Sequence, residues 1–171
     1  MYATLTTGGG SGSPVEERTL VPASGAAPVS LRTWGSEEEA RRAAAGATVW
    51  EVVDHHRGRC AGQQPTAVQV TTFEGPRSEE QAAADERSGR ERIWPAVADT
   101  DGLVDVLVLR RADRGMVVLV FVTAARHLEE HTRRIMSTEL LPGEDPALLG
   151  GPDRVEVHGV APAPVLASGR P

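Results

Sequence analysis

The strongest pattern in the sequence is a pair of apolar runs separated by a short polar segment. The runs cover residues 103–109 and 116–123, and the segment between them, Arg110 to Gly115, is rich in Arg and ends in Gly. Such a pattern predicts an antiparallel β-hairpin with a bulged or longer loop. In the second run the odd and the even positions are both apolar, so neither face of the hairpin is polar. We therefore expect helices to cover one face, and a second sheet or a partner subunit to cover the other.

The elements expected around the hairpin complete an α+β fold. They are a strand at residues 67–73, a helix from Ser78 to about Trp94, a helix at 128–140 and a last strand at 155–160. The first helix begins at a capping box and should stop before Pro95, because the residue preceding a proline disfavours helical geometry. The order is thus strand, helix, strand, strand, helix, strand. It predicts a ferredoxin-like antiparallel sheet of four strands with two helices on one face.

The first third of the chain carries a shorter version of this pattern. We expect strands at residues 1–7, 17–22 and 28–34. A capping box at Ser36 then opens a helix that we expect to extend through Val49, Val52 and Val53 to about His56, with Gly46 as a weak point. In this interpretation Asp54, His55, His56 and Arg57 cap a helix end, ahead of a loop that holds Cys60.

Two short matches suggest that the chain contains a repeat. Thr4–Thr7 resembles Gln69–Thr72, and Glu37–Arg42 resembles Glu129–Arg134; the two offsets differ by 27 residues, about one helix with its loops. One interpretation is a degenerate tandem repeat whose half-sheets cover one another. The other is chance similarity between strand-to-helix junctions. The predicted division is a partial repeat lacking its first helix (1–65), a complete repeat (66–160) and a disordered tail (161–171).

Composition excludes several classes of function. The net charge of −6 without a basic stripe argues against nucleic acid as a partner, and no apolar run approaches the roughly 20 residues of a membrane span. A single cysteine, Cys60, permits no intrachain disulfide, and the N-terminus lacks a signal-peptide pattern, so we expect a cytoplasmic protein. The sequence has no Lys, which excludes a Schiff-base lysine and a pyridoxal-phosphate site.

Asp105 and a pair of histidines are the first candidates for chemistry. Asp105 interrupts an apolar strand, so it is either a carboxylate with a raised pKa that acts as a base, or a solvated residue near the strand's start. His127 and His131 match the H-x-x-E-H pattern of inverted zincins. That chemistry needs a third ligand from elsewhere. The alternatives are a solvated helix start, or an acid–base or haem-ligating histidine near a pocket.

Two aromatic residues are candidates for contact with a ligand. Trp94 and Phe121 would line a pocket for a flat ligand, with Asp105 inside it and His127 and His131 near its mouth; the alternative is that both aromatic side chains are core. We expect no metal and no cofactor.

The arrangement of elements resembles the dimeric α/β-barrel superfamily, and within it the antibiotic-biosynthesis-monooxygenase-like branch common in actinobacteria. The resembling residues are Met1–Thr4, Val29–Trp34 running into the capped helix at Ser36, and the full strand and helix order from Val68 to Val160. In that superfamily two sheets pack face to face, and a pocket lies between each sheet and its helices. Some members oxidise aromatic polyketides without metal or flavin, and a related branch binds and degrades haem.

The resemblance leaves three functions open. The first is a small cofactor-independent monooxygenase or tailoring enzyme for a hydrophobic metabolite such as an aromatic polyketide, with Asp105 and His127 as catalytic residues and Trp94, Phe121 and His131 in contact with the substrate. The second is a non-catalytic binding or assembly protein. The third is a haem-binding protein. The resemblance also implies a homodimer, or a pseudo-dimer within one chain if the repeat is real.

Overall fold

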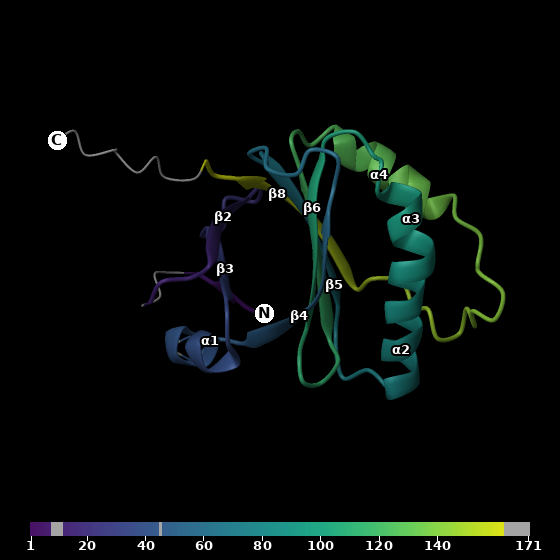
Figure 1. The fold of residues 1–171 in the computed structure, drawn as a ribbon, viewed down its shortest axis with the longest axis horizontal. Helices are drawn as coiled ribbons and strands as arrows, with labels where there is room; N and C mark the ends of the chain where they lie inside the picture. Colours follow the sequence, from purple (N-terminus) through teal and green to yellow (C-terminus); the bar gives the residue numbers. More distant parts are fainter. Residues whose placement is uncertain (8–11, 45, 163–171) are drawn as a thin grey trace.

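A closed sheet and a layer of helices make up the described part of the chain (Figure 1). The computed structural model describes residues 1–7, 12–44 and 46–162, so most of the tail predicted to be disordered lies outside the described residues. Within them the strands are β1 (Tyr2–Thr6), β2 (Glu16–Pro22), β3 (Val29–Trp34), β4 (Val49–Arg57), β5 (Ala67–Phe73), β6 (Leu103–Arg110), β7 (Met116–Val122) and β8 (Arg154–Val160). The helices are α1 (Glu37–Ala43), α2 (Glu79–Ser88), α3 (Trp94–Val97) and α4 (His127–Met136), with a π-helical turn, η1 (Gly89–Ile93), between α2 and α3. None of the described helices is long and apolar enough to span a membrane.

The strands pair in the order β1-β3-β2-β8-β5-β7-β6-β4, and β4 pairs with β1 to close the barrel. Read along the sheet, β4-β1-β3-β2 in the first half has the same order as β8-β5-β7-β6 in the second half. The α+β ferredoxin-like fold is therefore confirmed, and its two halves have the arrangement of a tandem repeat. The boundary between repeats at residue 65 stays a prediction.

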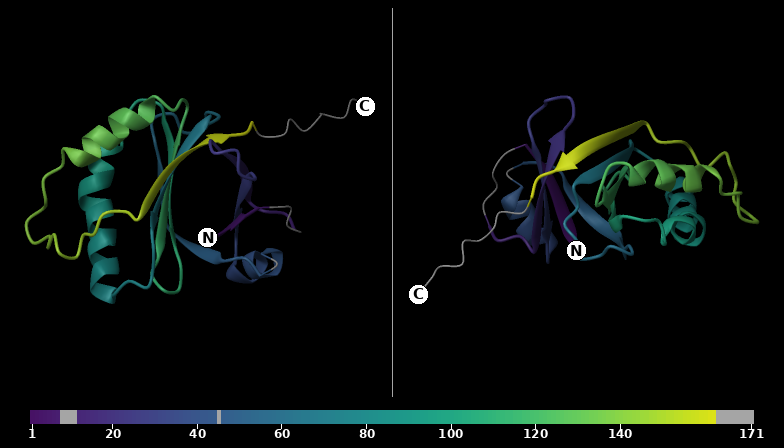
Figure 2. Two further views of the ribbon diagram at one scale, coloured as in Figure 1. Left: turned by 180° about the vertical axis from the view of Figure 1, so that it is seen from behind. Right: turned by 90° about the horizontal axis from the view of Figure 1, so that it is seen from above.

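The β6–β7 hairpin is confirmed, and both of its faces are covered. Leu107, Leu119 and Phe121 point into the barrel, where the first half-sheet of the same chain covers them. Val106 and Val120 point the other way, into a cluster with Leu128 of α4. Figure 2 shows the helical layer on the outer side of this half of the barrel.

The helix predicted from Ser36 to His56 is much shorter than expected. Its capping box is present, with Ser36 and Glu39 bonded reciprocally, but α1 ends at Ala43. The chain turns at Gly46, whose φ is +90°, and then continues as β4. The β-branched residues after Gly46 pair with β1 and β6, and this pairing with distant strands stabilises a strand where local sequence predicts a helix. Asp54–Arg57 therefore do not cap a helix.

Two other helix ends differ from the prediction. The helix that begins at Ser78 continues past Pro95 to Val97, because Pro95 lies in the first turn of α3, where its missing N–H is not needed. The preceding Trp94 keeps helical angles. Helix α4 ends at Met136 rather than at residue 140 as predicted.

An ion pair joins the two half-sheets across the barrel interior. Nη2 of Arg18 on β2 donates to Oδ2 of Asp105 on β6 at 2.6 Å, and the guanidinium stacks 4.2 Å from the ring centre of Phe121. Asp105 lies on the same strand face as Leu107, which points into the barrel, and Nε2 of His55 lies 3.4 Å from its Oδ1. Both charged side chains are largely buried. Arg18 compensates Asp105, and Arg18 is itself paired with a second, more exposed carboxylate, because Oε1 of Glu16 also lies 2.6 Å from its Nη2.

We expect Asp105→Ala to lower the free energy of unfolding by about 2 kcal/mol, because it removes the more buried of the two carboxylates that pair with the Arg18 guanidinium and leaves only Glu16. The matched control is Glu38→Ala, which breaks the exposed pair with Arg42 and should cost at most about 0.5 kcal/mol. Urea unfolding of both variants measures the difference. Equal losses would mean that the pair contributes no more than a surface contact.

Candidate functional site

A cavity of about 580 Å³ lies between the helices and the outer face of the second half-sheet. Its floor is apolar because one face of β6 and β7 contributes Val106, Val108, Val118 and Val120. Trp94 and other residues of the helical layer line the opposite side. The volume falls in the range of roughly 300–1,000 Å³ typical of small-molecule sites.

Helix α2 leaves space above the sheet because its buried residues are small. The buried residues of α2 are Ala82 and Ser88, and Gly89 follows at the start of η1. Ser88 and Gly89 line the cavity. These short side chains reach only a little way toward the valine floor.

A histidine, a carboxylate and an indole meet at one side of the cavity. A bulge between Val52 and Asp54 sets the register of β4, and Asp54 and His56 line the cavity while His55 contacts Asp105 inside the barrel. Nε2 of His56 lies 3.1 Å from Oδ2 of Asp54. The imidazole stacks on the Trp94 ring, with centroids 4.3 Å apart and planes 13° from parallel. This cluster combines a flat binding surface with an acid–base group beside a carboxylate.

Charged residues around the cavity occur mostly in pairs. Arg77 lies 2.7 Å from Asp85, and Glu86 accepts from Arg110 at 3.2 Å and from Arg90 at 3.1 Å. Burial raises the pKa of Asp85, although the guanidinium of Arg77 opposes this shift. Paired charges compensate one another at the rim and leave the valine floor as the main binding surface.

His131 is the most deeply buried histidine of the site. The residue is 2% exposed, lines the cavity, and its Nδ1 has no hydrogen-bond partner among the described residues. Burial, together with the nearby positive charge of Arg134, lowers the pKa of His131 to about 4. The imidazole is therefore neutral at pH 7.

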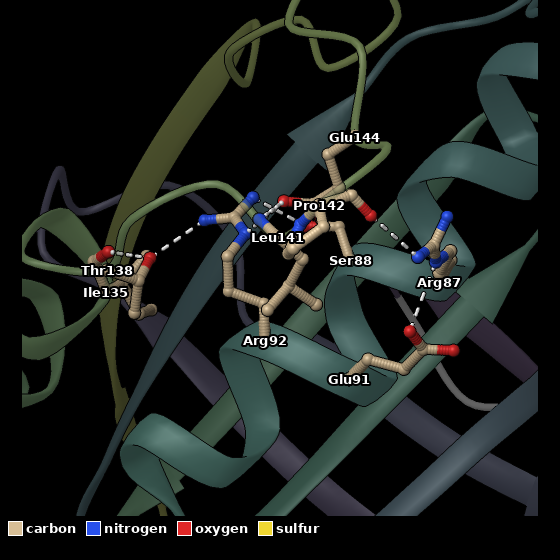
Figure 3. A network of polar contacts seen from close by, with 9 residues as sticks. All are labelled: Arg87, Ser88, Glu91, Arg92, Ile135, Thr138, Leu141, Pro142 and Glu144. Carbon is tan, nitrogen blue, oxygen red and sulfur yellow. Dashed lines mark hydrogen bonds and ion pairs between the residues drawn. The ribbon is translucent and has the colours of Figure 1, made fainter.

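The segment between α4 and β8, residues 137–153, closes one side of the cavity, where Leu149 and Pro152 are part of its lining. Figure 3 shows how Arg92 of η1 holds this segment: it donates to Glu144 at 2.9 Å and to Thr138 at 2.8 Å. Desolvation opposes ionisation of Glu144, but the Leu141 N–H and Arg92 outweigh it and lower the pKa of this carboxyl. The contact is thus a charged one at neutral pH.

The structure brings together only some of the residues predicted to form the site. Trp94 and His131 line the cavity. Phe121 and Asp105 lie on the opposite face of the same sheet, inside the barrel. His127 packs against Gly102, where an added Cβ would lie 2.3 Å from its ring. The expected single pocket is therefore divided by the sheet, because alternate residues of a strand face opposite sides.

Sequence reasoning missed Asp54 and His56. The residues were assigned to a helix, in which their side chains would not share a face. The signal that could have placed them is their spacing of two directly after the β-branched Val52 and Val53, which is typical of a strand. Among the described residues, no group of three or more His, Cys, Asp or Glu side chains gathers in a way that could hold a metal ion.

No protein-family model matches the chain, and no curated protein is similar enough in sequence to count as a relative. Solved structures are similar in fold. A haem-degrading enzyme from Listeria monocytogenes aligns with a TM-score of 0.59 and 8% identity, over 93% of this chain and 99% of that one. A ferredoxin-fold protein related to antibiotic biosynthesis monooxygenases, also from Listeria monocytogenes, aligns with a TM-score of 0.61 and 8% identity, over 95% of both chains. A major regulator of staphylococcal pathogenesis aligns with a TM-score of 0.61 and 10% identity, over 95% and 99%.

The chain therefore shares the ferredoxin-like fold of a protein related to antibiotic biosynthesis monooxygenases. This confirms the resemblance at the level of the fold. Proteins that share it include an enzyme and a regulator, so the fold by itself does not select an activity.

The buried His131 should make stability depend on pH. Its pKa is about 4 in the folded chain and about 6.5 in the unfolded chain, so the unfolded chain binds the proton more readily between these values. Keeping His131 neutral contributes about 3 kcal/mol to the free energy of unfolding above pH 6.5, and this contribution is lost as the pH falls toward 4. In His131→Leu the free energy of unfolding, measured with denaturant, should therefore fall less between pH 7.5 and pH 4.5 than it does in the wild type. Parallel curves for the two proteins would contradict this assignment.

Proposed function

We propose that the protein binds a flat, hydrophobic aromatic metabolite in the cavity and oxidises it as a cofactor-independent monooxygenase, with His56 as the general base. The observation that carries the proposal is the cluster of His56, Asp54 and Trp94 at the side of an apolar cavity. The structural similarity to a protein related to antibiotic biosynthesis monooxygenases supports the same reaction class.

The binding step depends on shape and on the apolar floor. The valines of β6 and β7 offer a flat surface, and the stacked rings of Trp94 and His56 offer an edge against which an aromatic ligand packs. The cavity volume suits a molecule of a few fused rings. The partner is thus a hydrophobic small molecule.

The chemical step begins with the transfer of a proton from the substrate to His56. A methylene between two aromatic rings, activated by a phenol, gives up a proton to His56, and the carboxylate of Asp54 stabilises the imidazolium that forms. Exposed side-chain fractions of 19% for His56 and 27% for Asp54 keep this pair partly shielded from water, which strengthens the interaction.

The overall reaction balances without another reductant. The carbanion transfers electrons to O₂, a carbon–oxygen bond forms, and the resulting hydroperoxide loses water to leave a carbonyl group. The substrate methylene and O₂ become a ketone and water, so the substrate supplies all the electrons. Asp105 and His127, which lie outside the cavity, have no role in this scheme.

We expect the protein to accelerate the oxidation of a hydroxylated anthrone, measured as O₂ uptake together with quinone absorbance. His56→Gln should lower the rate by about 10²–10⁴-fold, the usual contribution of a general base, because the amide cannot accept the proton. The matched control is His55→Gln, which changes the neighbouring histidine that faces the barrel and should retain the rate.

The same assay separates the enzyme from a binding protein. Full activity in His56→Gln would remove this histidine as the base. A wild-type protein that binds the anthrone, as seen by quenching of Trp fluorescence, but forms no quinone would instead be a non-catalytic binding protein of the same fold.

His131 favours haem binding as a second candidate function. Iron is ligated by neutral imidazole, and His131 is neutral at pH 7, lines the cavity and has an unpartnered ring nitrogen. Arg90 and Arg110 at the rim share the single carboxylate of Glu86, so one positive charge remains for a haem carboxylate. Bound haem would supply redox chemistry, and His131 would hold its iron.

If this second function is correct, haemin should give a shifted Soret band with the wild-type protein and lose it with His131→Ala. His127→Ala should retain the band, because His127 packs against Gly102 and does not line the cavity. A band that survives in both variants would eliminate these ligands.

A further inference from the structure

A second opening continues the cavity along the edge of the helical layer. It lies beside α4 and is lined by residues that include Leu128 and Thr132 of α4, Gln69 of β5 and Val157 of β8. Its volume is about 580 Å³. We call this opening the α4–β8 cleft.

The cleft and the cavity are parts of one depression. Gln69 and Thr132 line both of them. Val155 lines the cavity, and Val157, two residues further along β8, lines the cleft. Residues two apart on a strand share a face, and in the sheet Val157 pairs with Gln69. The cleft therefore adjoins the cavity at Gln69 and Thr132, next to β8.

The region around this junction has an apolar surface that the protein does not cover. Val155 is 52% exposed and Val157 is 44% exposed, and Met136 at the end of α4 is 78% exposed. Figure 2 shows β8 at the edge of the helical layer, to one side of α4. Neighbouring exposed apolar residues that extend a binding cavity indicate a surface for a ligand.

The chemistry of the cleft selects an uncharged occupant. Its outer lining holds Glu129 and Arg133, one charge of each sign, so it attracts neither an anion nor a cation. A folded protein partner is disfavoured because a stable interface buries about 800 Å² on each side, far more than two valines and a methionine provide. The distance from Val155 to Val157 along the strand is about 7 Å, the length of a short alkyl chain.

We infer that the ligand has two parts: an aromatic portion in the cavity and an unbranched aliphatic tail that lies along β8 in the α4–β8 cleft. This inference rests on the proposed function, because it assumes that the cavity holds the aromatic portion. It adds a substrate class, alkyl-substituted aromatic metabolites, and identifies Val155 and Val157 as the residues that select for the tail.

The test uses three hydroxylated anthrones: one without a tail, one with a propyl tail and one with a hexyl tail. Affinity is measured by quenching of Trp fluorescence. For the wild-type protein we expect affinity to rise with tail length, by up to about fourfold for each methylene that is buried. The readout is the ratio of the affinities for the hexyl and the tail-less compound, which cancels any change in binding of the rings.

Val157→Asp should reduce this ratio to near one, because a carboxylate replaces apolar surface in the cleft. Val157→Thr keeps a β-branched side chain suited to the strand and should lower the ratio partly, so the inference stays testable if the Asp variant fails to fold. The matched control is Val21→Asp on β2, which is also exposed, at 42%, and lines neither opening; it should keep the wild-type ratio.

The outcomes distinguish this inference from the proposed function. Binding of the tail-less anthrone with no gain from the tail, or the same gain in Val157→Asp as in the wild type, would overturn the two-part ligand alone. Failure of all three compounds to bind would overturn both proposals. A gain that is lost in Val157→Asp and kept in Val21→Asp supports the inference.

Discussion

Both faces of the β6–β7 hairpin are apolar, and neither can be left in water without a large cost in free energy. The helices cover one face, and the first half-sheet of the same chain covers the other, so the barrel closes within one chain. Every feature of the site depends on this double coverage. Where α2 faces the sheet its buried residues, Ala82 and Ser88, are small and leave space above the valines.

The polar groups inside the barrel and those in the cavity have different roles. Inside the barrel, Arg18 from one half meets Asp105 and Phe121 from the other, in a contact that joins the half-sheets. On the outer face, His56 stacks on Trp94 beside Asp54 and remains open to a ligand. The two groups are separated by a single sheet, so a charge on the inner face contributes to stability while one on the outer face is available for chemistry.

Two bulges affect which side chains point into the barrel and which point into the cavity. A bulge between Val52 and Asp54 and another between Leu103 and Asp105 interrupt the regular pairing. A bulge changes the side to which the following residues point. In this way His55 contacts Asp105 inside the barrel, and its neighbour His56 reaches the cavity. Without the bulges, the same sequence would place its charges on other faces.

The sequence by itself determined the hairpin, the two capping boxes and the strand and helix order of the second half, because these depend on local periodicity and on side chains a few residues apart. It did not determine that residues after Gly46 form β4, since that strand is stabilised by pairing with β1 and β6, far away in the chain. Trp94 was predicted to contact a ligand from its residue type and His131 from a short motif, and both line the cavity, whereas Asp54 and His56 were not predicted to lie there. Only the tertiary structure decided which side chains share a cavity, because strand register and bulges set the direction of each side chain and leave little trace in local sequence.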